Sequence, residues 1–410
     1  MAGSSALRNP GFRVFITTYL FAMMADNVEH VISYWVAFQK LHSQALGGFA
    51  VLAHWLPFLG FSVWVGSLND RFDSRRIIQI GMALFITASL GWGYFFVTDT
   101  LSIPIACALL VLHGFAGVFW QTSSQMLLYD IVGPELLPSA VRLNATARSL
   151  GVLVGPGVGV GVMYLLGPTY GIFVNTLFYL PLMLWLVRAP YGRHFRKSTA
   201  AAPKRAVRGI SDIVQTIRDV RPIKVIGSML VLAGAASFFI GNSYQAQMPT
   251  FATDLGHGKG DLFYSLLLGA DAAGALTAGI LFETNRGLMP MKPRLAMVLS
   301  LMWAASLAAF ALAGNYIATI VLLFCAGFCE LSFSSMAQAL VQMNAPDAIR
   351  GRVLGLFNMT SLGLRAFAGI TVGLVGSLLT VHTSLALAAA AFAFVIVGLL
   401  VRTARPTVAA

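Results

Sequence analysis

Long apolar runs, separated by short polar breaks, follow one another along the whole chain. The hydrocarbon core of a bilayer is about 30 Å thick and takes roughly 20 helical residues to cross, so runs of this length predict transmembrane helices. The first half carries six such runs, near 12–38, 46–68, 77–97, 102–127, 140–165 and 169–188. The second half carries six more, near 223–247, 261–282, 292–313, 316–341, 352–377 and 381–402. The pattern predicts an all-α membrane protein of twelve transmembrane helices, counted here as helices 1 to 12.

The composition excludes a soluble protein. Of the 410 residues, 58% are hydrophobic and only 10% are charged, whereas soluble domains carry about 25% charged residues. A soluble domain of this size needs more charge to cover its surface. Much of the apolar surface is therefore expected to face lipid.

Basic residues mark one side of the predicted membrane. The net charge is +12, and Lys and Arg gather in alternate connections and in the stretch from Arg188 to Lys224. The opposite side holds only Lys40 and Lys259. Because basic loops stay on the cytoplasmic side, both termini are expected in the cytoplasm. This distribution accounts for the positive charge, so no nucleic-acid partner is expected.

The second half of the chain repeats the first at an offset of about 212 residues. Pro10 before helix 1 matches Pro222 before helix 7, and Gly114 in helix 4 matches Gly327 in helix 10. Parallel repeats of this kind are typical of secondary transporters. The predicted parts are a six-helix bundle over 1–189, a basic cytoplasmic linker over 190–220, and a second six-helix bundle over 221–410.

A polar motif connects predicted helices 2 and 3. It consists of Gly66, Asp70, Arg71, Arg75 and Arg76. Gly66 permits a close helix approach, and Asp70 can accept hydrogen bonds from a neighbouring helix N-terminus and pair with an arginine. We interpret the motif as a cytoplasmic latch, with Glu283 as its counterpart after helix 8. The alternative is a basic loop that only follows the charge rule.

Predicted helix 5 carries a second motif. Its members are Arg148, Gly151, Gly155, Pro156 and Gly159. Glycines at every fourth residue form a groove without side chains, in which another helix can pack. Pro156 removes one helical hydrogen bond and is expected to bend the helix. Helix 8, which is also rich in small residues, is the expected partner. Generic small-residue packing is the alternative.

Both motifs resemble signatures of the major facilitator superfamily. The loop resembles that family's connection between helices 2 and 3, and helix 5 is similar to its antiporter motif, which marks exporters. Val160 departs from the motif, because the family usually has a glycine there. Other stretches resemble the bacterial branch with enterobactin-type siderophore exporters and macrolide-type drug efflux proteins: Asn9–Arg13, Ala25–Asp26, Leu136–Ala140, Leu143–Ala145 and Arg350–Val353. The resemblance covers essentially the whole chain. It implies two six-helix bundles around one central site, in the bacterial inner membrane.

Several ionisable and polar residues lie inside predicted helices, where a charge costs several kcal/mol. The resemblance implies that helices 1, 4, 7 and 10 line the central cavity. Those helices carry Asp26, Glu29, His30, His113, Trp120, Gln121, Asn242, Tyr244, Gln245 and Glu330. We expect Asp26, Glu29 and Glu330 to carry protons or bind a cation, with His30 and His113 in support. The alternative is an ion pair that only fixes packing. His54 is a weaker candidate, and Asp271 is interpreted first as an inter-helix pairing residue.

Helix 4 departs from the family pattern. Many proton-driven drug exporters have an arginine three residues before a Gln-Gly pair in this helix. Here Leu110 and His113-Gly114 occupy those positions. The usual proton route through helix 4 is therefore absent.

The sequence thus predicts a transporter that exports a small amphipathic organic molecule by proton antiport and alternating access. It is expected to be a monomer in the bilayer, without enzymatic activity, driven by the proton gradient, and with no cofactor and no metal. One alternative is an importer of a metal or a nutrient, with His30, His54 and His113 as soft ligands. Another is a membrane receptor or enzyme that transports nothing.

Overall fold

The computed structural model describes residues 5–192, 210–257, 261–285, 290–368 and 378–404. These residues are almost all helical, and no strand occurs among them. They form two compact units. The N-terminal unit comprises Ser4–Asp219 and Ala345–Met359, and the C-terminal unit comprises Val220–Asn344 and Thr360–Ala410.

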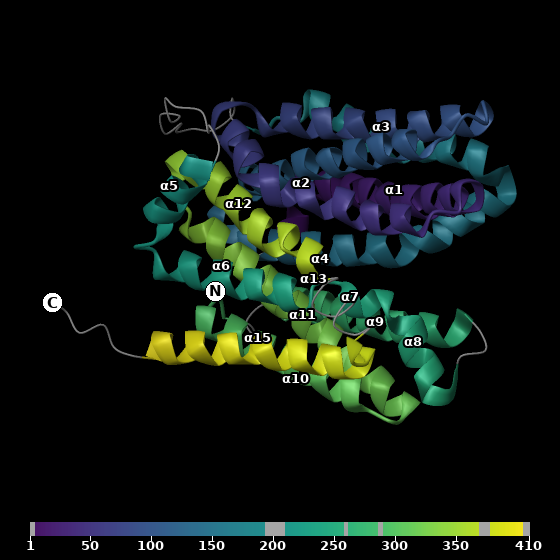
Figure 1. Ribbon diagram of the computed structural model, residues 1–410. Coiled ribbons are helices and arrows are strands. Elements are labelled where there is room, and N and C mark those ends of the chain that lie inside the picture. Colours follow the sequence, from purple (N-terminus) through teal and green to yellow (C-terminus); the bar gives the residue numbers. More distant parts are fainter. Residues whose placement is uncertain (1–4, 193–209, 258–260, 286–289, 369–377, 405–410) are drawn as a thin grey trace. The chain divides into compact units, whose positions relative to one another are not determined.

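The N-terminal unit is built mainly from long helices that run side by side (Figure 1). The long helices are α1 (Pro10–Leu41), α2 (Gln44–Arg71), α3 (Ser74–Val97) and α4 (Ile103–Arg188). Shorter elements are η1 (Ala6–Arg8) and, from later in the chain, η4 (Asp347–Ile349) and α12 (Arg350–Asn358). Side-chain caps begin two of them. Ser43 accepts a hydrogen bond from the Leu46 amide before α2, and Asp73 accepts one from the Arg75 amide before α3. α4 packs on α1, α2 and α3 and forms the centre of this unit.

α4 contains the three predicted helices 4, 5 and 6. Its backbone leaves helical dihedral angles at Gly133 (φ 70°, ψ 179°) and Gly167 (φ 74°, ψ 163°). Positive φ is accessible to glycine at little cost, so the chain turns at these two positions. The stretch 128–139, predicted as a break, is helical apart from Gly133. Dihedral angles stay helical at Pro156, where we expected a bend.

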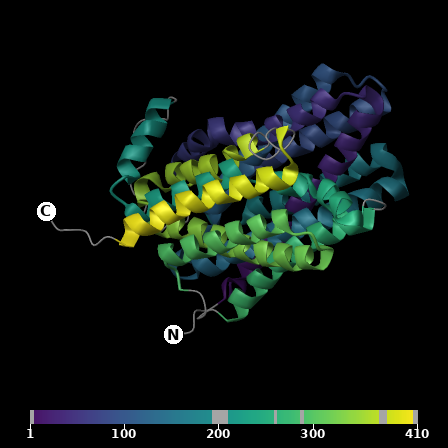
Figure 2. The ribbon, with the colours of Figure 1, turned by 60° about the horizontal axis from the view of Figure 1, so that its bottom comes forward.

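The C-terminal unit has more interrupted helices. Its elements are α6 (Lys224–Phe239), α7 (Ser243–Ala246), α8 (Met248–Ala252), η3 (Thr253–His257), α9 (Asp261–Thr284), α10 (Pro293–Leu312), α11 (Tyr316–Asn344), η5 (Met359–Gly363), α13 (Arg365–Ala368) and α15 (Val381–Ala404). α9 packs on α11, and α10 packs on both α11 and α15 (Figures 1 and 2). α5 (Ile210–Val220) precedes α6. The linker residues 193–209 lie outside the described part of the chain.

Two predicted helices are broken here. Helix 7 was predicted over 223–247, but α6 ends at Phe239 and the chain turns at Gly241, where φ is +50°. An added Cβ on Gly241 would lie 2.7 Å from the Cβ of Ala368, so only glycine fits. Helix 11 passes through the π-helical turn η5, a rare local form that is frequent at functional sites. Its predicted residues 369–377 lie outside the described chain.

Glycines repeat one helix approach in both units. A Cβ on Gly114 in α4 would clash with the backbone carbonyl of Ala53 in α2. A Cβ on Gly327 in α11 would clash with the carbonyl of Asp271 in α9. The glycine pair identified in the sequence repeat therefore makes equivalent contacts in the two halves.

The outer surface is apolar, as a bilayer requires. In the described chain, eight helices are long and apolar enough to cross a membrane, and one of them is the 86-residue α4. Large apolar side chains remain exposed on them, including Tyr164, Leu165 and Phe394. Lipid contact removes the cost that this exposure would have in water. The chain is an integral, all-helical membrane protein over the residues that the structure describes.

Candidate functional site

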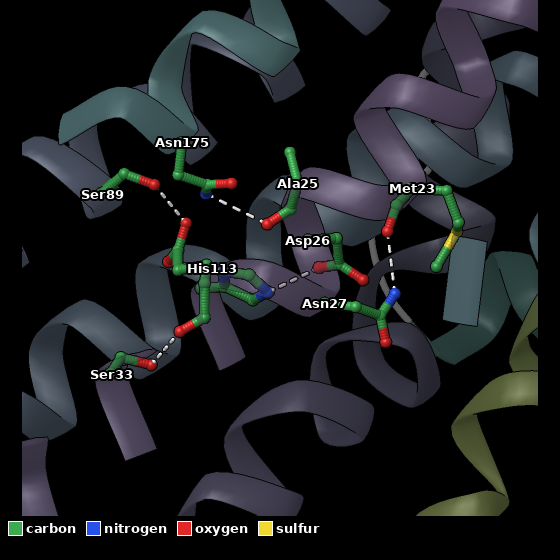
Figure 3. Close-up of polar contacts among 9 residues, drawn as sticks. Met23, Ala25, Asp26, Asn27, Ser33, Ser89, His113 and Asn175 are labelled. Carbon is green, nitrogen blue, oxygen red and sulfur yellow. Dashed lines mark hydrogen bonds and ion pairs between the residues drawn. The ribbon is translucent and has the colours of Figure 1, made fainter. Parts of the chain in front are cut away.

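A buried imidazole joins two carboxylates in the N-terminal unit. Nε2 of His113, on α4, lies 2.8 Å from Oδ1 of Asp26, and its Nδ1 lies 2.8 Å from Oε1 of Glu29. Figure 3 shows the contact between His113 and Asp26. All three side chains are almost inaccessible, with 1–5% of their surface exposed. Carboxylates only accept hydrogen bonds, so this geometry fits an imidazolium that donates to both acids.

Two packed helices, α1 and α4, position these groups. Asp26 and Glu29 are three residues apart on α1 and therefore share one face. His113 lies on the facing section of α4, one residue before the glycine that lets α4 approach α2. Each ionisable group is thus fixed by a packed helix rather than by a loop.

Neutral polar side chains surround the acids. Ser89 on α3 donates a hydrogen bond to Oε2 of Glu29. Ser33 donates to the backbone carbonyl of Glu29 over 2.6 Å, and Asn175 donates to the carbonyl of Ala25 over 3.0 Å. Figure 3 shows Ser89 and Asn175 pointing to this part of α1, and Ser33 on α1 itself. Two neighbouring helices, α3 and α4, therefore hold this part of α1 in place.

Three histidines meet at the same place. His30 on α1, His54 on α2 and His113 on α4 each offer a ring nitrogen, and these nitrogens lie within 4.8 Å of one another. Their ring centroids are 4.6 Å apart for His30 and His113, 5.0 Å for His30 and His54, and 5.7 Å for His54 and His113. Sequence reasoning ranked His54 below the other two, but the structure places it in the same group.

Aromatic rings cover the imidazoles. Phe85 contacts His113 edge-on at 4.7 Å and stacks on Tyr179 at 5.1 Å. Trp120, a predicted cavity residue, is fully buried. Its ring centroid lies 5.8 Å from that of Phe85 and 5.0 Å from that of Tyr19. Trp120 thus packs behind the site. The neighbouring Gln121 is also buried.

The C-terminal unit holds a second acidic cluster. The hydroxyl of Tyr244 donates to the carboxylate of Asp271 over 3.1 Å, and Nε2 of Gln245 donates to it over 3.0 Å. Glu330 is close enough to interact electrostatically with both Asp271 and Tyr244. Asn242 takes the N-cap position of α7 but makes no capping bond with its side chain. The structure therefore brings Tyr244, Gln245 and Glu330 together with Asp271, which the sequence analysis interpreted as an inter-helix pairing residue.

Asp70 caps a helix that follows it by 281 residues. Its Oδ1 accepts the backbone N–H of Gly351 over 2.6 Å, and its Oδ2 accepts that of Arg352 over 3.1 Å. The Ile349 side chain at the N-cap of α12 offers no acceptor, so Asp70 takes that role from α2. The guanidinium Nε of Arg352 lies 4.0 Å from the same carboxylate. The helix N-terminus and the arginine predicted as partners of Asp70 are both present.

Gly66 allows this contact. A Cβ on Gly66 would clash with the carbonyl of Gly351, and a Cβ on Gly351 would clash with the carbonyl of Gly66. A Cβ on Gly355 would clash with the carbonyl of Ser62. α2 and α12 therefore meet backbone to backbone along two turns.

The basic residues of the motif have separate partners. Arg75 pairs with Asp73 over 2.6 Å and donates to the carbonyl of Ala189, just past the end of α4, over 2.5 Å. Arg76 donates to Gln79 over 2.9 Å. Arg75 thus joins the loop to the end of the sixth transmembrane helix.

The other two residues of the predicted latch lie at helix ends. Arg71 is the last residue of α2, and Glu283 is buried in the last turn of α9. Each has an electrostatic or hydrogen-bond partner. Their positions match those expected from the repeat.

The glycine groove of helix 5 packs on α1, and the expectation of helix 8 as its partner is wrong. A Cβ on Gly151 would lie 2.7 Å from Met23, and one on Gly155 would lie 2.6 Å from Asn27. Gly159 faces Val28. The groove therefore packs on the turns of α1 that also bear Asp26 and Glu29. Arg148, at the start of the motif, interacts electrostatically with Tyr19 on α1.

Sequence reasoning missed the neutral side chains around the acids. Ser89 and Asn175 are uncharged polar residues in apolar helices, where such residues commonly only pack. A buried asparagine in an apolar run is a weak signal that a backbone carbonyl needs a donor. Ser89 carries no such signal, because its partner Glu29 is 60 residues away.

Comparisons with known proteins agree with this architecture. The family model for the Major Facilitator Superfamily matches residues 14–369. The enterobactin exporter EntS of Salmonella paratyphi A is 24% identical over 404 residues, covering 96% of this chain and 91% of that protein. Among solved structures, the fucose:proton symporter FucP of E. coli aligns with a TM-score of 0.73 at 12% identity, covering 96% of this chain and 98% of that chain. A bacterial homologue of the iron transporter ferroportin, in an outward-facing state, aligns with a TM-score of 0.73 at 15% identity, covering 96% and 100%.

Long apolar helices with buried acids on the first of them are typical of membrane transporters. The family model matches most of the chain, and this match identifies the class of transporter. The protein belongs to the Major Facilitator Superfamily.

Proposed function

We propose that this transporter exports a small amphipathic organic molecule, drug-like or siderophore-like, in exchange for protons. It works as a monomer in the bacterial cytoplasmic membrane, with both termini in the cytoplasm. The proton gradient supplies the energy for alternating access, and no cofactor takes part in this energy coupling. The polar groups of α1, α4, α7 and α11 serve substrate and protons.

Export is supported by the relatives and by the helix 5 motif. A relative that covers 96% of this chain is named an enterobactin exporter. The groove of Gly151, Gly155 and Gly159 resembles the antiporter motif of exporters, and it packs on the helix that bears Asp26 and Glu29. A movement of α1 caused by protonation of those acids would therefore directly affect the packing of the motif.

One observation carries the proton coupling: His113 lies between two buried carboxylates at 2.8 Å from each. Two carboxylates and one imidazole that share so small a space form a coupled group, whose protons belong to all three side chains. Such a group can bind and release a proton without exposing a bare charge to the apolar surroundings. It also replaces the arginine that the family's usual helix 4 route requires.

The acids of the C-terminal unit add a second titratable group. Asp271 and Glu330 interact electrostatically, and Tyr244 and Gln245 offer hydrogen-bond donors to Asp271. Donors of this kind stabilise a carboxylate when no proton is bound. We include Glu330 with Asp26 and Glu29 among the proton carriers.

Transport by purified protein in proteoliposomes tests the proposal. Vesicles with an imposed pH gradient should accumulate a fluorescent cationic dye or a catecholate siderophore, and the accumulation should collapse when a protonophore removes the gradient. Equal transport with and without the gradient would rule out proton antiport. Transport only in the direction of the proton flux would indicate a symporter.

A further inference from the structure

The three histidines of the N-terminal unit converge from three different helices. His30, His54 and His113 present ring nitrogens within 4.8 Å of one another, inside a shell of aromatic side chains. Imidazole is both a common catalytic group and the commonest metal ligand. The question is which nitrogens of these rings are already in use.

Hydrogen bonds account for some of the nitrogens and not for others. Nδ1 of His113 is held by Glu29, whose second oxygen accepts from Ser89. His30 makes a hydrogen bond to the backbone of Asp26. Nδ1 of His54 is buried and, within the described part of the chain, has no hydrogen-bond partner. A buried nitrogen without a partner costs about 1–3 kcal/mol, and a ligand bound to this ring would remove that cost.

We propose that His30, His54 and His113 form a binding site for a divalent first-row transition-metal ion, with Asp26 as the fourth ligand. Imidazole nitrogen suits zinc, copper, iron and nickel, and three histidines are a known ligand set for tetrahedral zinc. Oδ1 of Asp26 is 2.8 Å from Nε2 of His113, so these two atoms have to move apart by only about 0.5 Å to bind one ion.

Glu29 gives His113 the arrangement expected of a metal ligand. A ligating histidine usually donates its other ring N–H to a carboxylate, which fixes its tautomer and its orientation. Glu29 contacts Nδ1 of His113, so Nε2 remains for the ion, which replaces the contact to Asp26. Ser89 orients the carboxylate of Glu29 in turn.

The rings need only a small movement to bind an ion. Zinc–nitrogen bonds of about 2.0–2.1 Å place tetrahedral ligand atoms roughly 3.3 Å apart. The nitrogens now lie within 4.8 Å of one another. Side-chain rotation can close this difference without moving a helix. All four ligands belong to one unit, so the site is complete in it.

Aromatic packing is the competing explanation. His30 contacts Tyr34 edge-on at 5.1 Å, and His54 contacts Trp55 edge-on at 4.5 Å. Such contacts would be made equally well by phenylalanine, which has no nitrogen to leave unpaired. The partnerless Nδ1 of His54 therefore favours a ligand over packing alone.

Metal binding to the purified full-length protein tests this site. The protein is prepared with a tag that lacks histidine, stripped with a chelator and dialysed against Zn²⁺ or Co²⁺ in detergent. We expect one ion per chain, intense visible absorption from four-coordinate Co²⁺, and three imidazoles around zinc by X-ray absorption. A wild-type protein that binds no ion, or an ion with fewer than two imidazoles, would overturn the proposal.

Variants separate this site from other histidines. His54→Gln should weaken binding by more than about 100-fold, and Glu29→Gln by about 10–100-fold, as outer-shell changes do. His382→Gln is the matched control, because His382 pairs with Asp254 in the C-terminal unit at 3.1 Å. Equal affinity in His54→Gln and wild type would contradict the site. No gradient is present in this assay, so its outcome is independent of proton antiport.

Discussion

Oδ1 of Asp26 on α1 and Nε2 of His113 on α4 are 2.8 Å apart, although 87 residues separate them in the sequence. The contact joins the first and fourth transmembrane helices at a buried position. Glu29 holds the other side of the same imidazole. Removing one charge should therefore disturb a group of three side chains rather than a single ion pair.

Glu29→Gln should abolish gradient-driven efflux while substrate binding remains. Glutamine keeps the volume and most hydrogen bonds of the acid but cannot release a proton. Transport and binding are measured in proteoliposomes between pH 6 and 8, where the variant should show a weaker pH dependence. Asp254→Asn is the matched control, because it removes a half-exposed carboxylate–histidine pair. Asp26→Asn is the internal comparison. If Glu29→Gln still pumps with normal pH dependence, Glu29 is only a packing residue.

Glu330→Gln tests the second acidic cluster. A neutral residue there removes the electrostatic interaction with Asp271 and Tyr244. We expect lost uphill transport with retained counterflow of substrate, because exchange needs no net proton movement. Tyr244→Phe, which removes one donor to Asp271, should have a smaller effect in the same assay. Loss of folded protein instead would indicate a structural role for Glu330.

Asp70→Asn should lower transport and leave expression largely intact. Asparagine keeps one acceptor oxygen but loses the charge that faces the N-terminus of α12, an interaction of about 0.3–1 kcal/mol. The melting temperature in detergent should fall slightly, and accessibility of cysteines introduced near Gly351 to a thiol reagent should rise. Glu283→Gln should show a weaker effect of the same kind. Unchanged transport and accessibility in Asp70→Asn would reduce the motif to a basic loop.

Gly155→Leu should impair folding or transport, whereas Gly157→Leu should be tolerated. A Cβ on Gly155 would lie 2.6 Å from Asn27 and 3.1 Å from the carbonyl of Met24, but nothing lies within 4 Å of a Cβ on Gly157. Overpacking typically costs about 1–3 kcal/mol. Thermal stability and transport of the two variants are compared side by side. Equal behaviour would mean that the groove is no interface.

Reporter fusions test the orientation. A fusion at Asp70 or Arg205 should report the cytoplasm, and a fusion at Lys40 should report the outside, as the basic loops require. Lys40 pairs with the exposed Asp99 after α3 and lowers its pKa, so both ends should be found on one side. An external signal at Arg205 would contradict the orientation.

The sequence predicted the helices and most of the polar residues, because apolar length and buried charge leave strong local signals. The break at Gly241 and the π-turn after Asn358 were missed, because glycine and polar residues also occur inside regular membrane helices. The partner of the helix 5 groove was assigned wrongly for a related reason. A stripe of glycines shows that a backbone approaches, but any helix with small or flexible side chains can supply that backbone.

The grouping of His54 with His30 and His113 could not be read from spacing. His30 and His113 are 83 positions apart, and His54 lies on a third helix, so only packing brings them together. The close approach at Gly114 sets this packing, since it seats α4 directly against Ala53, beside His54. The glycine could be identified in the sequence, but the helix that packs against it, α2, could not.

The contact of Gly66 with Gly351, and of Ser62 with Gly355, has no interlocking side chains. Two helices joined in this way can separate once the hydrogen bonds of Asp70 break, because no side chain has to change its rotamer first. A wedge only one isopropyl group wide, as in Gly351→Val, would be enough to hold them open. Such a variant should fix the transporter in a single state, which would make it a practical starting point for trapping that state with a substrate bound.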